Sequence, residues 1–299
     1  MKCTYCNNES VVTIRKRKLC KEHFNNYYKK RIEKVLKKVP IKSKRILVAL
    51  SGGKDSVSIF HFLSKAKDKY KFYLEGIFID LGIEKFSEKS KMISIKLADS
   101  LGLNLNVVSL KEIYKKTIDE ISEKEKKVCA SCGTIKRFVI NDFAYKNNFD
   151  FIITGHNMDD ETIFLNQNIL SGSIEYIKRY TRFYTETLQN LKLIGKIKPQ
   201  FFVSENDNKV YCNVNNLEYV KDSCPYSKKS PHKKLEWFVK NLNKKMDYSY
   251  NFLNFFLKIN DYLPETKINE FHFCPECGYP TVNKTICKFC RIIKNWCLK

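Results

Sequence analysis

The sequence has no run of the roughly 18 apolar residues that a membrane-spanning helix requires. Its first residues, Met1-Lys2-Cys3, also lack the apolar core of a secretory signal peptide. We therefore expect a cytoplasmic protein without membrane association. Because thiols stay reduced in that compartment, the twelve cysteines are predicted to be metal ligands or catalytic groups rather than disulfides.

Acidic residues are scarce relative to basic ones. The 299 residues include 55 Lys and Arg but only 32 Asp and Glu, which gives a formal net charge of +23. Solubility alone is the alternative explanation, but an excess of this size favours a polyanionic partner, most simply a nucleic acid. Such charge gives affinity for phosphates without selecting a base sequence.

The Walker A pattern G-x-x-x-x-G-K-[ST] is also absent. Instead, the apolar run Ile46–Leu50 is followed by S-G-G-K-D-S at residues 51–56 and then by a helical pattern. A strand, a tight turn and a helix start in this order direct backbone N–H groups at one point, which suits a phosphate. The glycines allow the backbone to approach the anion closely, and Lys54 adds a mobile positive charge.

All six positions of this stretch match the PP-loop, S-G-G-x-D-S, which it resembles. The resemblance implies an ATP pyrophosphatase, an enzyme that cleaves ATP between its α- and β-phosphates. A Gly-Gly turn beside a solvated lysine is the alternative. Within the stretch, Asp55 is suited to cap the helix or to help hold a metal ion such as Mg²⁺.

Strand and helix patterns alternate after this loop. Strands are predicted at 72–80, 105–110 and 150–154, and helices at 57–63, at 89–101 and from 159 onward. This alternation predicts an α/β fold with a doubly wound parallel sheet and right-handed crossovers. Because ligands of such sheets lie beyond the carboxyl ends of the strands, we expect the adenosine of ATP near Phe78–Asp80.

Two cysteine-rich segments flank the predicted sheet, and each has the spacing of a closed tetrahedral zinc site. The predicted ligands are Cys3, Cys6, Cys20 and His23 in the first segment, and Cys274, Cys277, Cys287 and Cys290 in the second. The sequence therefore predicts an N-terminal zinc finger with a basic helix at 1–39, a PP-loop domain at 40–265 and a C-terminal zinc ribbon at 266–299. The Lys-rich faces of the helix at 24–38 favour contact with an RNA backbone over a merely solvated surface.

Three further cysteines are Cys129, Cys132 and, far along the chain, Cys224. Cys129 and Cys132 precede a helical pattern that runs to about Tyr145, and a helix N-terminus lowers thiol pKa values, so we expect thiolates there. The pair fits a redox couple, half of a zinc site or two ligands of an iron–sulfur cluster. Cys212 and Cys297 are interpreted as bystanders.

Two helices rich in aromatic residues are predicted between 233 and 259. Their apolar side chains are expected in the core rather than on a stacking platform; they are Val239, Leu242, Phe252, Phe255 and Phe256.

Taken together, the two zinc motifs, S-G-G-K-D-S, C-A-S-C-G at 129–133, T-G-H-N-M-D-D-E at 154–161 and Cys224 resemble the TtuA family of tRNA 2-thiolation enzymes. The resemblance covers essentially the whole chain in the same order. The related TtcA cytidine thiolases share the PP-loop and the CxxC but lack the flanking zinc modules. The uninterrupted G-H-N-M-D-D motif modestly favours the branch that modifies the T-loop uridine over the wobble-uridine branch.

This resemblance implies the cofactors ATP, Mg²⁺, a [4Fe–4S] cluster and two Zn²⁺. It implies catalytic roles for Cys129, Cys132, Cys224, Lys136 and Asp160, with the three cysteines as the iron–sulfur ligands. The implied ATP-binding residues are Ala49, Ser51, Gly52, Gly53, Lys54, Asp55, Ser56, Phe78, Asp80, Lys136, Gly155 and His156.

The implied reaction is adenylation of a tRNA uridine at its C2 oxygen, followed by sulfur transfer through the cluster to give 2-thiouridine. The sulfur donor would be a thiocarboxylated ubiquitin-like protein or free sulfide. Whether the protein forms a homodimer is left open by the sequence. Three alternatives remain: persulfide chemistry on the same cysteines without a cluster, a PP-loop tRNA ligase that does not thiolate, and a non-catalytic RNA-binding zinc protein.

Overall fold

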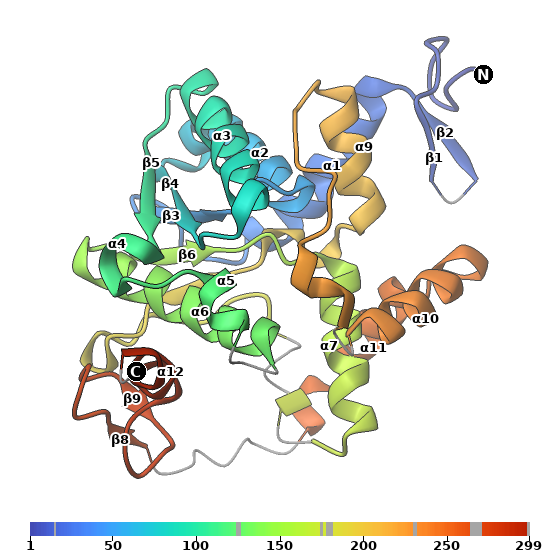
Figure 1. Cartoon of the computed structure of the whole chain (residues 1–299). Helices are drawn as coiled ribbons and strands as arrows, with labels where there is room; N and C mark the ends of the chain where they lie inside the picture. The colour runs from blue at the N-terminus through green and yellow to red at the C-terminus, as the bar shows by residue number, and fades with distance from the viewer. Residues whose placement is uncertain are drawn as a thin grey trace.

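The computed structural model describes residues 1–14, 16–123, 127–173, 176–177, 182–229, 232–263 and 271–297. Its centre is a five-stranded sheet in the order β5-β4-β3-β6-β7, and every neighbouring pair of strands is parallel (Figure 1). The strands are β3 (Arg45–Leu50), β4 (Tyr73–Asp80), β5 (Leu105–Ser109), β6 (Phe151–Ile153) and β7 (Gly195–Ile197). The predicted α/β fold with a parallel sheet is confirmed.

Helices connect these strands and cover the sheet. They are α1 (Lys21–Leu36), α2 (Lys54–Tyr70), α3 (Glu84–Ser100), α4 (Leu110–Tyr114), α5 (Ile118–Ser122), α6 (Val128–Lys146), α7 (Met158–Leu170), α9 (Glu205–Val214), α10 (His232–Lys245) and α11 (Tyr248–Ile259). Short 3₁₀ turns are η1 (Gln189–Leu191), η2 (Pro199–Phe202), η3 (Pro225–Lys229) and η4 (Asn260–Tyr262).

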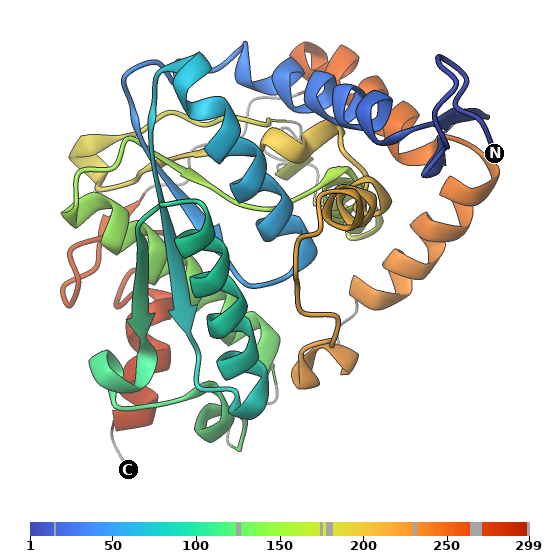
Figure 2. The same cartoon turned by 90° about the horizontal axis from the view of Figure 1, so that it is seen from above.

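Apolar side chains of the strands alternate between two buried layers, as a sheet covered on both faces requires. Along β3, Ile46 and Val48 join the layer that contains residues of α1, α2, α3 and α9, whereas Leu47 joins the layer that contains residues of α5 and α6. Figures 1 and 2 show these helix sets on opposite sides of the sheet. The doubly wound arrangement is thus present.

The two cysteine-rich modules lie at opposite ends of the molecule (Figures 1 and 2). The N-terminal module is a hairpin of β1 (Val12–Ile14) and β2 (Arg17–Leu19) that leads into α1. The C-terminal module is a hairpin of β8 (His272–Phe273) and β9 (Pro280–Thr281) followed by α12 (Lys288–Cys297). Among the helices that the structure describes, none combines the length and apolar character that a bilayer crossing requires.

The elements differ from the sequence expectations mainly at their ends. The helix expected at 57–63 spans Lys54–Tyr70, and the one expected at 89–101 already begins at Glu84. In the aromatic-rich helices, Val239 and Phe256 are buried as predicted. The prediction was wrong for Phe255, which is 56% exposed because α11 packs on its neighbours through the face that holds Leu253 and Phe256.

Candidate active site and metal centres

The PP-loop at residues 51–53 joins β3 to the N-terminus of α2. Gly52 has a φ of +72°, and a Cβ atom there would lie 2.8 Å from the carbonyl oxygen of Ser90. Both the left-handed backbone and the close approach to α3 therefore require glycine. The N–H group of Ser51 donates to Oγ of Ser56 at 3.1 Å, and that Oγ donates to the carbonyl of Gly53 at 3.0 Å. These bonds brace the loop from within.

Other predicted ATP-binding residues gather at the same edge of the sheet. Leu50 pairs with Phe78 in the register of β3 and β4, so Asp80 ends its strand beside the loop. The Phe78 side chain is buried, so contact with a ligand from this residue has to come from its backbone. A Cβ atom on Gly155, after β6, would lie 2.9 Å from the amide nitrogen of Ser56. The β6–α7 loop therefore packs directly on the start of α2.

Lys54 is held by two carboxylates. Its Nζ lies 3.1 Å from Oδ2 of Asp55 and 2.9 Å from Oε1 of Glu205 at the start of α9. Burial disfavours its charged form, but the two carboxylates outweigh burial and raise the pKa of Lys54 above its usual value. The lysine is therefore a fixed positive charge at the helix start. Glu205 also contacts Nζ of Lys240 at 2.9 Å, which ties α10 to this lysine.

Buried amides support Asp55 from behind. Its Oδ1 accepts hydrogen bonds from Nδ2 of Asn157 at 3.2 Å and from Nδ2 of Asn208 at 2.7 Å. The amide nitrogen of Gln200, which is fully buried, lies 2.8 Å from Oδ1 of Asn208 and 3.1 Å from both the Asp55 carbonyl and the Tyr28 hydroxyl. This network connects α1, α2, η2 and α9 through the base of the PP-loop.

Asp160 lies in the first turn of α7. Asn157 and Asp160 form a capping box, in which Oδ2 of Asp160 accepts the N–H of Asn157 at 3.1 Å. Burial, followed by the charges of Asp55, Glu161 and Asp159, raises the pKa of Asp160 to about 8. A carboxyl that holds a proton at neutral pH beside a phosphate site is suited to acid–base chemistry.

His156 precedes this cap. Although its side chain reaches solvent, the protein atoms around it and then the charges of Lys198 and Lys196 lower the pKa of the imidazole. The ring is therefore neutral at physiological pH. Its Nδ1 lies 3.0 Å from Oγ1 of Thr154, which fixes its orientation.

The three cysteines outside the zinc motifs occupy neighbouring segments. Cys129 and Cys132 lie in the first turns of α6, and Cys224 directly precedes η3. The Sγ of Cys129 donates to the carbonyl of Tyr226 at 3.1 Å, and the Tyr226 hydroxyl donates to Oδ1 of Asp119 at 2.7 Å. These contacts hold η3 against α5 and α6, and so bring Cys224 to the CxxC.

The expectation of lowered thiol pKa values is wrong for Cys132. Burial, followed by the negative charges of Cys224 and Cys129, raises the pKa of Cys132, and the nearby cations Lys136 and Arg137 only partly oppose this shift. The position of the thiol in the second turn of α6 leaves it little benefit from the helix terminus. Its electrostatic interaction with both other thiols is consistent with one shared site.

The donor set of this site is three thiols, which is chemically compatible with the implied iron–sulfur cluster. Within the described ranges, the metal-ligand groups whose donor atoms converge within 4.8 Å are the two terminal ones, and the three cysteines are not among them. Ligands of a cluster bind different irons and need not converge as closely. Of the other cysteines whose side chains the structure describes, seven belong to the terminal groups, and Cys212 is buried against the Lys54 carbonyl. Three soft sulfur donors are a ligand set that suits the implied cluster.

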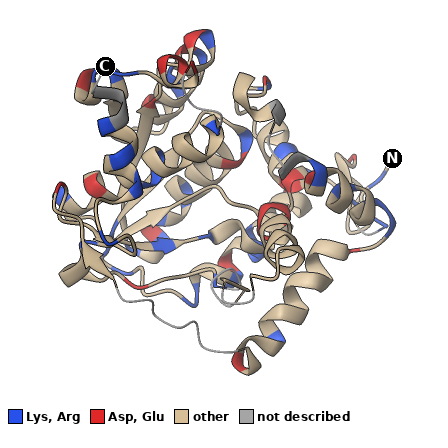
Figure 3. Cartoon of the chain, turned by 60° about the horizontal axis from the view of Figure 1, so that its bottom comes forward, with Lys and Arg blue, Asp and Glu red and all other residues tan. Residues whose placement is uncertain are grey.

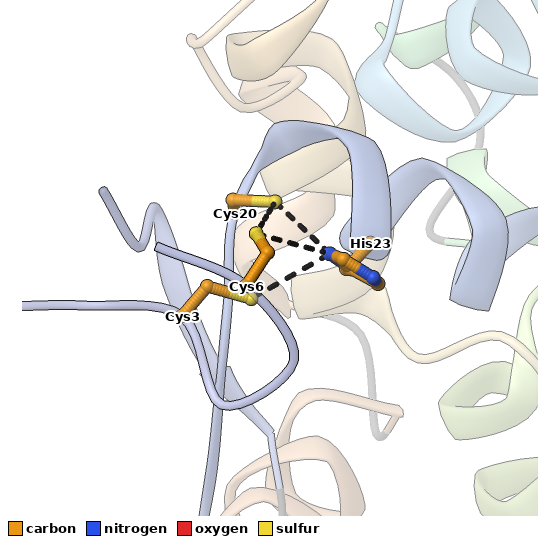
Figure 4. A group of neighbouring side chains, drawn as sticks. All are labelled: Cys3, Cys6, Cys20 and His23. Carbon is orange, nitrogen blue, oxygen red and sulfur yellow. Dashed lines mark hydrogen bonds between the residues drawn. The ribbon is translucent and has the colours of Figure 1, made fainter. Parts of the chain in front are cut away.

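The N-terminal cluster has the geometry of a zinc site (Figure 4). The Sγ atoms of Cys6 and Cys20 are 3.7 Å apart, and Nδ1 of His23 lies 3.6 Å from the Sγ atoms of Cys3 and Cys6 and 3.2 Å from that of Cys20. A tetrahedral Zn²⁺ with ordinary bond lengths would place S···S at about 3.8 Å and S···N at about 3.6 Å. The predicted convergence of these four residues is confirmed.

The C-terminal cluster of Cys274, Cys277, Cys287 and Cys290 also converges, with 3.7 Å between the Sγ atoms of Cys277 and Cys287. Backbone N–H groups donate to sulfur atoms within it, as at Cys287 to Cys274 at 3.3 Å. Figure 3 shows Lys and Arg on both terminal modules and along the sheet, in agreement with the charge expected from the sequence.

The fold and this site define an ATP-binding protein of the PP-loop class. The model of the PP-loop domain family matches residues 24–235, which include the loop, the CxxC and Cys224. The chain is 35% identical to the tRNA-5-methyluridine(54) 2-sulfurtransferase of Pyrococcus horikoshii, and the match covers 100% of this chain and 94% of that protein. It is equally 35% identical to the enzyme of the same name from Thermotoga maritima, with 98% and 96% covered. The chain belongs to the TtuA family of PP-loop tRNA 2-thiolation proteins.

Among solved structures, the U34-tRNA thiolase NcsA from Methanococcus maripaludis, described with its [4Fe–4S] cluster, superimposes with a TM-score of 0.81. The two chains are 25% identical, and the match covers 99% of this chain and 96% of that one. The sequence-based recognition of the family and of the fold is thus confirmed.

Sequence reasoning did not find Glu205, Asn208 or Gln200 as supports of the PP-loop. One signal was present: Ser204 and Asp207 form the S-x-x-D capping box that begins α9 and so places Glu205 in its first turn. The pairing of Glu205 with Lys54 joins residues about 150 positions apart in sequence, for which no local pattern exists.

Proposed function

We propose that this protein is an ATP-dependent tRNA sulfurtransferase that converts a uridine of the T-loop to 2-thiouridine. The observation that carries the proposal is the direct link between the PP-loop and the third cysteine. The N–H of Val220 donates to the carbonyl of Gly52 at 2.9 Å. Cys224 follows four residues later, so its Cα lies no more than about 14 Å from that of Val220. The names of the two relatives support the T-loop uridine, and the modest argument from the G-H-N-M-D-D motif agrees with them.

Adenylation is the first half of the proposed reaction. The N–H groups at the start of α2 and Lys54 bind the phosphates of ATP while the C2 oxygen of an extruded uridine attacks the α-phosphorus. The bond to the β-phosphate oxygen breaks, pyrophosphate leaves, and the C2 oxygen becomes part of a good leaving group. Both carboxylate oxygens of Asp55 already accept hydrogen bonds from protein groups. We therefore expect Mg²⁺ to bind together with ATP, whose phosphate oxygens supply further ligands.

Sulfur transfer is the second half. Cys129, Cys132 and Cys224 would hold the [4Fe–4S] cluster, which when bound supplies an iron without a protein ligand at which inorganic sulfide can be held. Sulfide attacks C2, the C2–O bond breaks and AMP leaves, so the exchange of oxygen for sulfur needs no oxidant or reductant. Lys136 is assigned to the phosphate charge, and Asp160, with its raised pKa, to proton transfer. The two terminal modules are assigned one Zn²⁺ each.

Anaerobic thiolation of a tRNA transcript with ATP, Mg²⁺ and sulfide tests this function. Position-mapped nucleoside mass spectrometry should find 2-thiouridine in the T-loop. Cys224→Ala should remove iron and thiolation with folding intact, whereas Ser223→Ala, its exposed neighbour, should retain both. Thiolation by a colourless, iron-free protein would instead support persulfide chemistry on the same cysteines, and full activity of Cys224→Ala would refute the three-cysteine site.

A matched pair of glycine variants tests the binding and cleavage of ATP. Gly52 and Gly102 both have left-handed φ angles, +72° and +60°, but only at Gly52 would a Cβ atom meet the backbone of Ser90. Gly52→Ala should weaken ATP binding at least tenfold and abolish pyrophosphate release, while Gly102→Ala should lose only about 1 kcal/mol of stability. Equal ATP affinities of the two variants would argue against phosphate binding at this loop.

A further inference from the structure

A second cavity lies on the N-terminal module, away from the PP-loop. It measures about 520 Å³ and is bounded by the first cysteine turn, the β1–β2 hairpin and the start of α1. The lining side chains are Tyr5, Ile14, Arg17, Leu19, His23, Asn26, Tyr27, Lys30 and Arg31. Three of them are cationic and none is acidic, so the cavity selects for an anion.

Aromatic and cationic groups are combined in its wall. Tyr5 is 53% exposed, and its hydroxyl accepts a hydrogen bond from Arg17 at 2.9 Å. The Tyr5 ring packs on His23 with 5.4 Å between ring centroids, so the metal cluster fixes its position. A rigid exposed ring beside exposed Arg17 and Lys30 is the arrangement that stacks on a nucleobase and neutralises the adjoining phosphate.

The cavity continues toward the PP-loop. A neighbouring hollow of about 680 Å³ shares Ile14, Tyr27 and Arg31 with it and extends to Lys54 and to Trp237 on α10. Four acidic residues also line this hollow: Glu205 is paired with Lys54 and Lys240, Asp159 accepts hydrogen bonds from Asn243 and Ser249, Asp207 caps α9, and Asp247 precedes α11. The N-terminal part is therefore the segment that discriminates in favour of phosphate.

We propose that the cavity at Tyr5, Arg17 and Lys30 binds an unstacked nucleotide of the RNA substrate at a distance from the reacting uridine. This inference rests on the proposed function for the identity of the RNA. The volume fits one nucleotide, and the shared wall lets a bound strand continue toward Lys54. The occupant is RNA rather than an acidic protein because an exposed ring bonded to an arginine suits a planar base beside a phosphate.

Binding of a fluorescein-labelled tRNA transcript, followed by anisotropy, tests the proposal. Tyr5→Ala should weaken binding about tenfold, while Tyr5→Phe, which keeps the ring, should stay within about twofold of the unmodified protein. Arg17→Gln should reduce the slope of log affinity against log salt by about 1. Matched controls outside the N-terminal module are Tyr73→Ala and Lys96→Gln, both exposed, and neither should change affinity or slope.

Zinc content is measured for every variant. If Tyr5→Ala loses metal, the tRNA affinities of Arg17→Gln and Lys30→Gln test the proposal instead, because neither residue belongs to the cysteine turns. A 4-thiouridine-substituted transcript should crosslink to the peptide that contains Tyr5. Unchanged affinity and salt slope in all cavity variants would overturn the proposal. It would also be overturned if the cavity variants bound RNA normally but lost sulfur transfer from a protein donor, because the cavity would then bind that donor instead of RNA.

Thiolation is scored separately. Tyr5→Ala should raise the tRNA concentration for half-maximal rate about tenfold and leave the rate at saturating tRNA unchanged. If the unmodified protein binds tRNA through this cavity but does not thiolate it, the proposed function fails and the inference stands. If thiolation proceeds and Tyr5→Ala behaves like the unmodified protein, only the inference fails.

Discussion

The two cysteine clusters have similar ligand spacing, but they contact the protein in opposite ways. At the C-terminal cluster, Phe289 stacks on Phe138 of α6 with 3.7 Å between ring centroids and 8° between ring planes, and Tyr279 packs edge-on against Phe138. At the N-terminal cluster, the aromatic neighbour Tyr5 is mostly exposed beside an open cationic cavity. One cluster therefore buttresses the helix that carries Cys129 and Cys132, and the other presents a surface.

Removing one metal ligand from each cluster should give the largest difference between the two ends of the molecule. Cys287→Ser is expected to lose the C-terminal zinc, to release Phe289 from α6 and to lower the iron content by more than half, because structural zinc contributes about 10 kcal/mol or more to folding such modules. Cys6→Ser should lose its own zinc and tRNA affinity but keep the iron. Metal analysis and tRNA titration of both variants measure the difference. Full iron content in Cys287→Ser would remove the buttressing role.

Aromatic truncation sharpens the same contrast. Phe138→Ala removes the stacking partner of Phe289 and should cost about 3 kcal/mol of unfolding free energy, whereas Tyr5→Ala should cost less than about 0.5 kcal/mol because its ring is exposed. Phe138→Leu is the control that keeps most of the apolar volume. Urea unfolding gives all three values, and equal costs at the two ends would contradict the assignment.

Two tyrosine hydroxyl groups, of Tyr28 and Tyr279, form side-chain hydrogen bonds whose contributions to stability can be compared. Tyr28 on α1 is fully buried and bonds to Asn208 at 2.7 Å, whereas Tyr279 is 8% exposed and bonds to Asp142 at 3.0 Å in a partly buried contact. Tyr28→Phe should cost about 2 kcal/mol, since it leaves buried amides unpaired, and Tyr279→Phe about 1 kcal/mol. Thermal unfolding of the two variants under identical conditions tests the order, which a larger loss for Tyr279→Phe would reverse.

The smallest effect is expected at the ribbon surface. Lys294 pairs with Glu276 at 2.6 Å, but both side chains are more than two-fifths exposed. Lys294→Gln should therefore change stability by less than about 0.5 kcal/mol. A double-mutant cycle with Glu276→Gln measures the coupling. A coupling above about 1 kcal/mol would mean that surface charge, and not the stacked rings, attaches the ribbon.

Local patterns predicted the parts of the molecule that depend on short spacing. The strand–turn–helix at the PP-loop and the convergence of Cys3, Cys6, Cys20 and His23 are each encoded in one short segment, and the alternation that builds the sheet repeats from one element to the next along the chain. Their geometry follows from backbone conformation and ligand spacing, which neighbouring residues determine.

The remaining features depend on contacts between distant segments. Gln200 contacts Tyr28 and Asp55 across more than 140 residues, and no periodicity in sequence announces such a buried network. Cys132 was expected to be a thiolate from its helix position, but tertiary burial outweighs the helix terminus. Phe255 was expected in the core because its segment is apolar, yet a single helix face decides which ring is covered.

The hydrogen bond from Val220 to Gly52 attaches the segment that precedes Cys224 to the PP-loop. Three residues separate this bond from Cys224, and Asp222 of the same linker forms an exposed ion pair with Lys89 of α3 at 2.6 Å, which adds little stability. A linker of this length has little slack with which to absorb movement of the loop. The position of Cys224 therefore depends on the backbone conformation of the PP-loop.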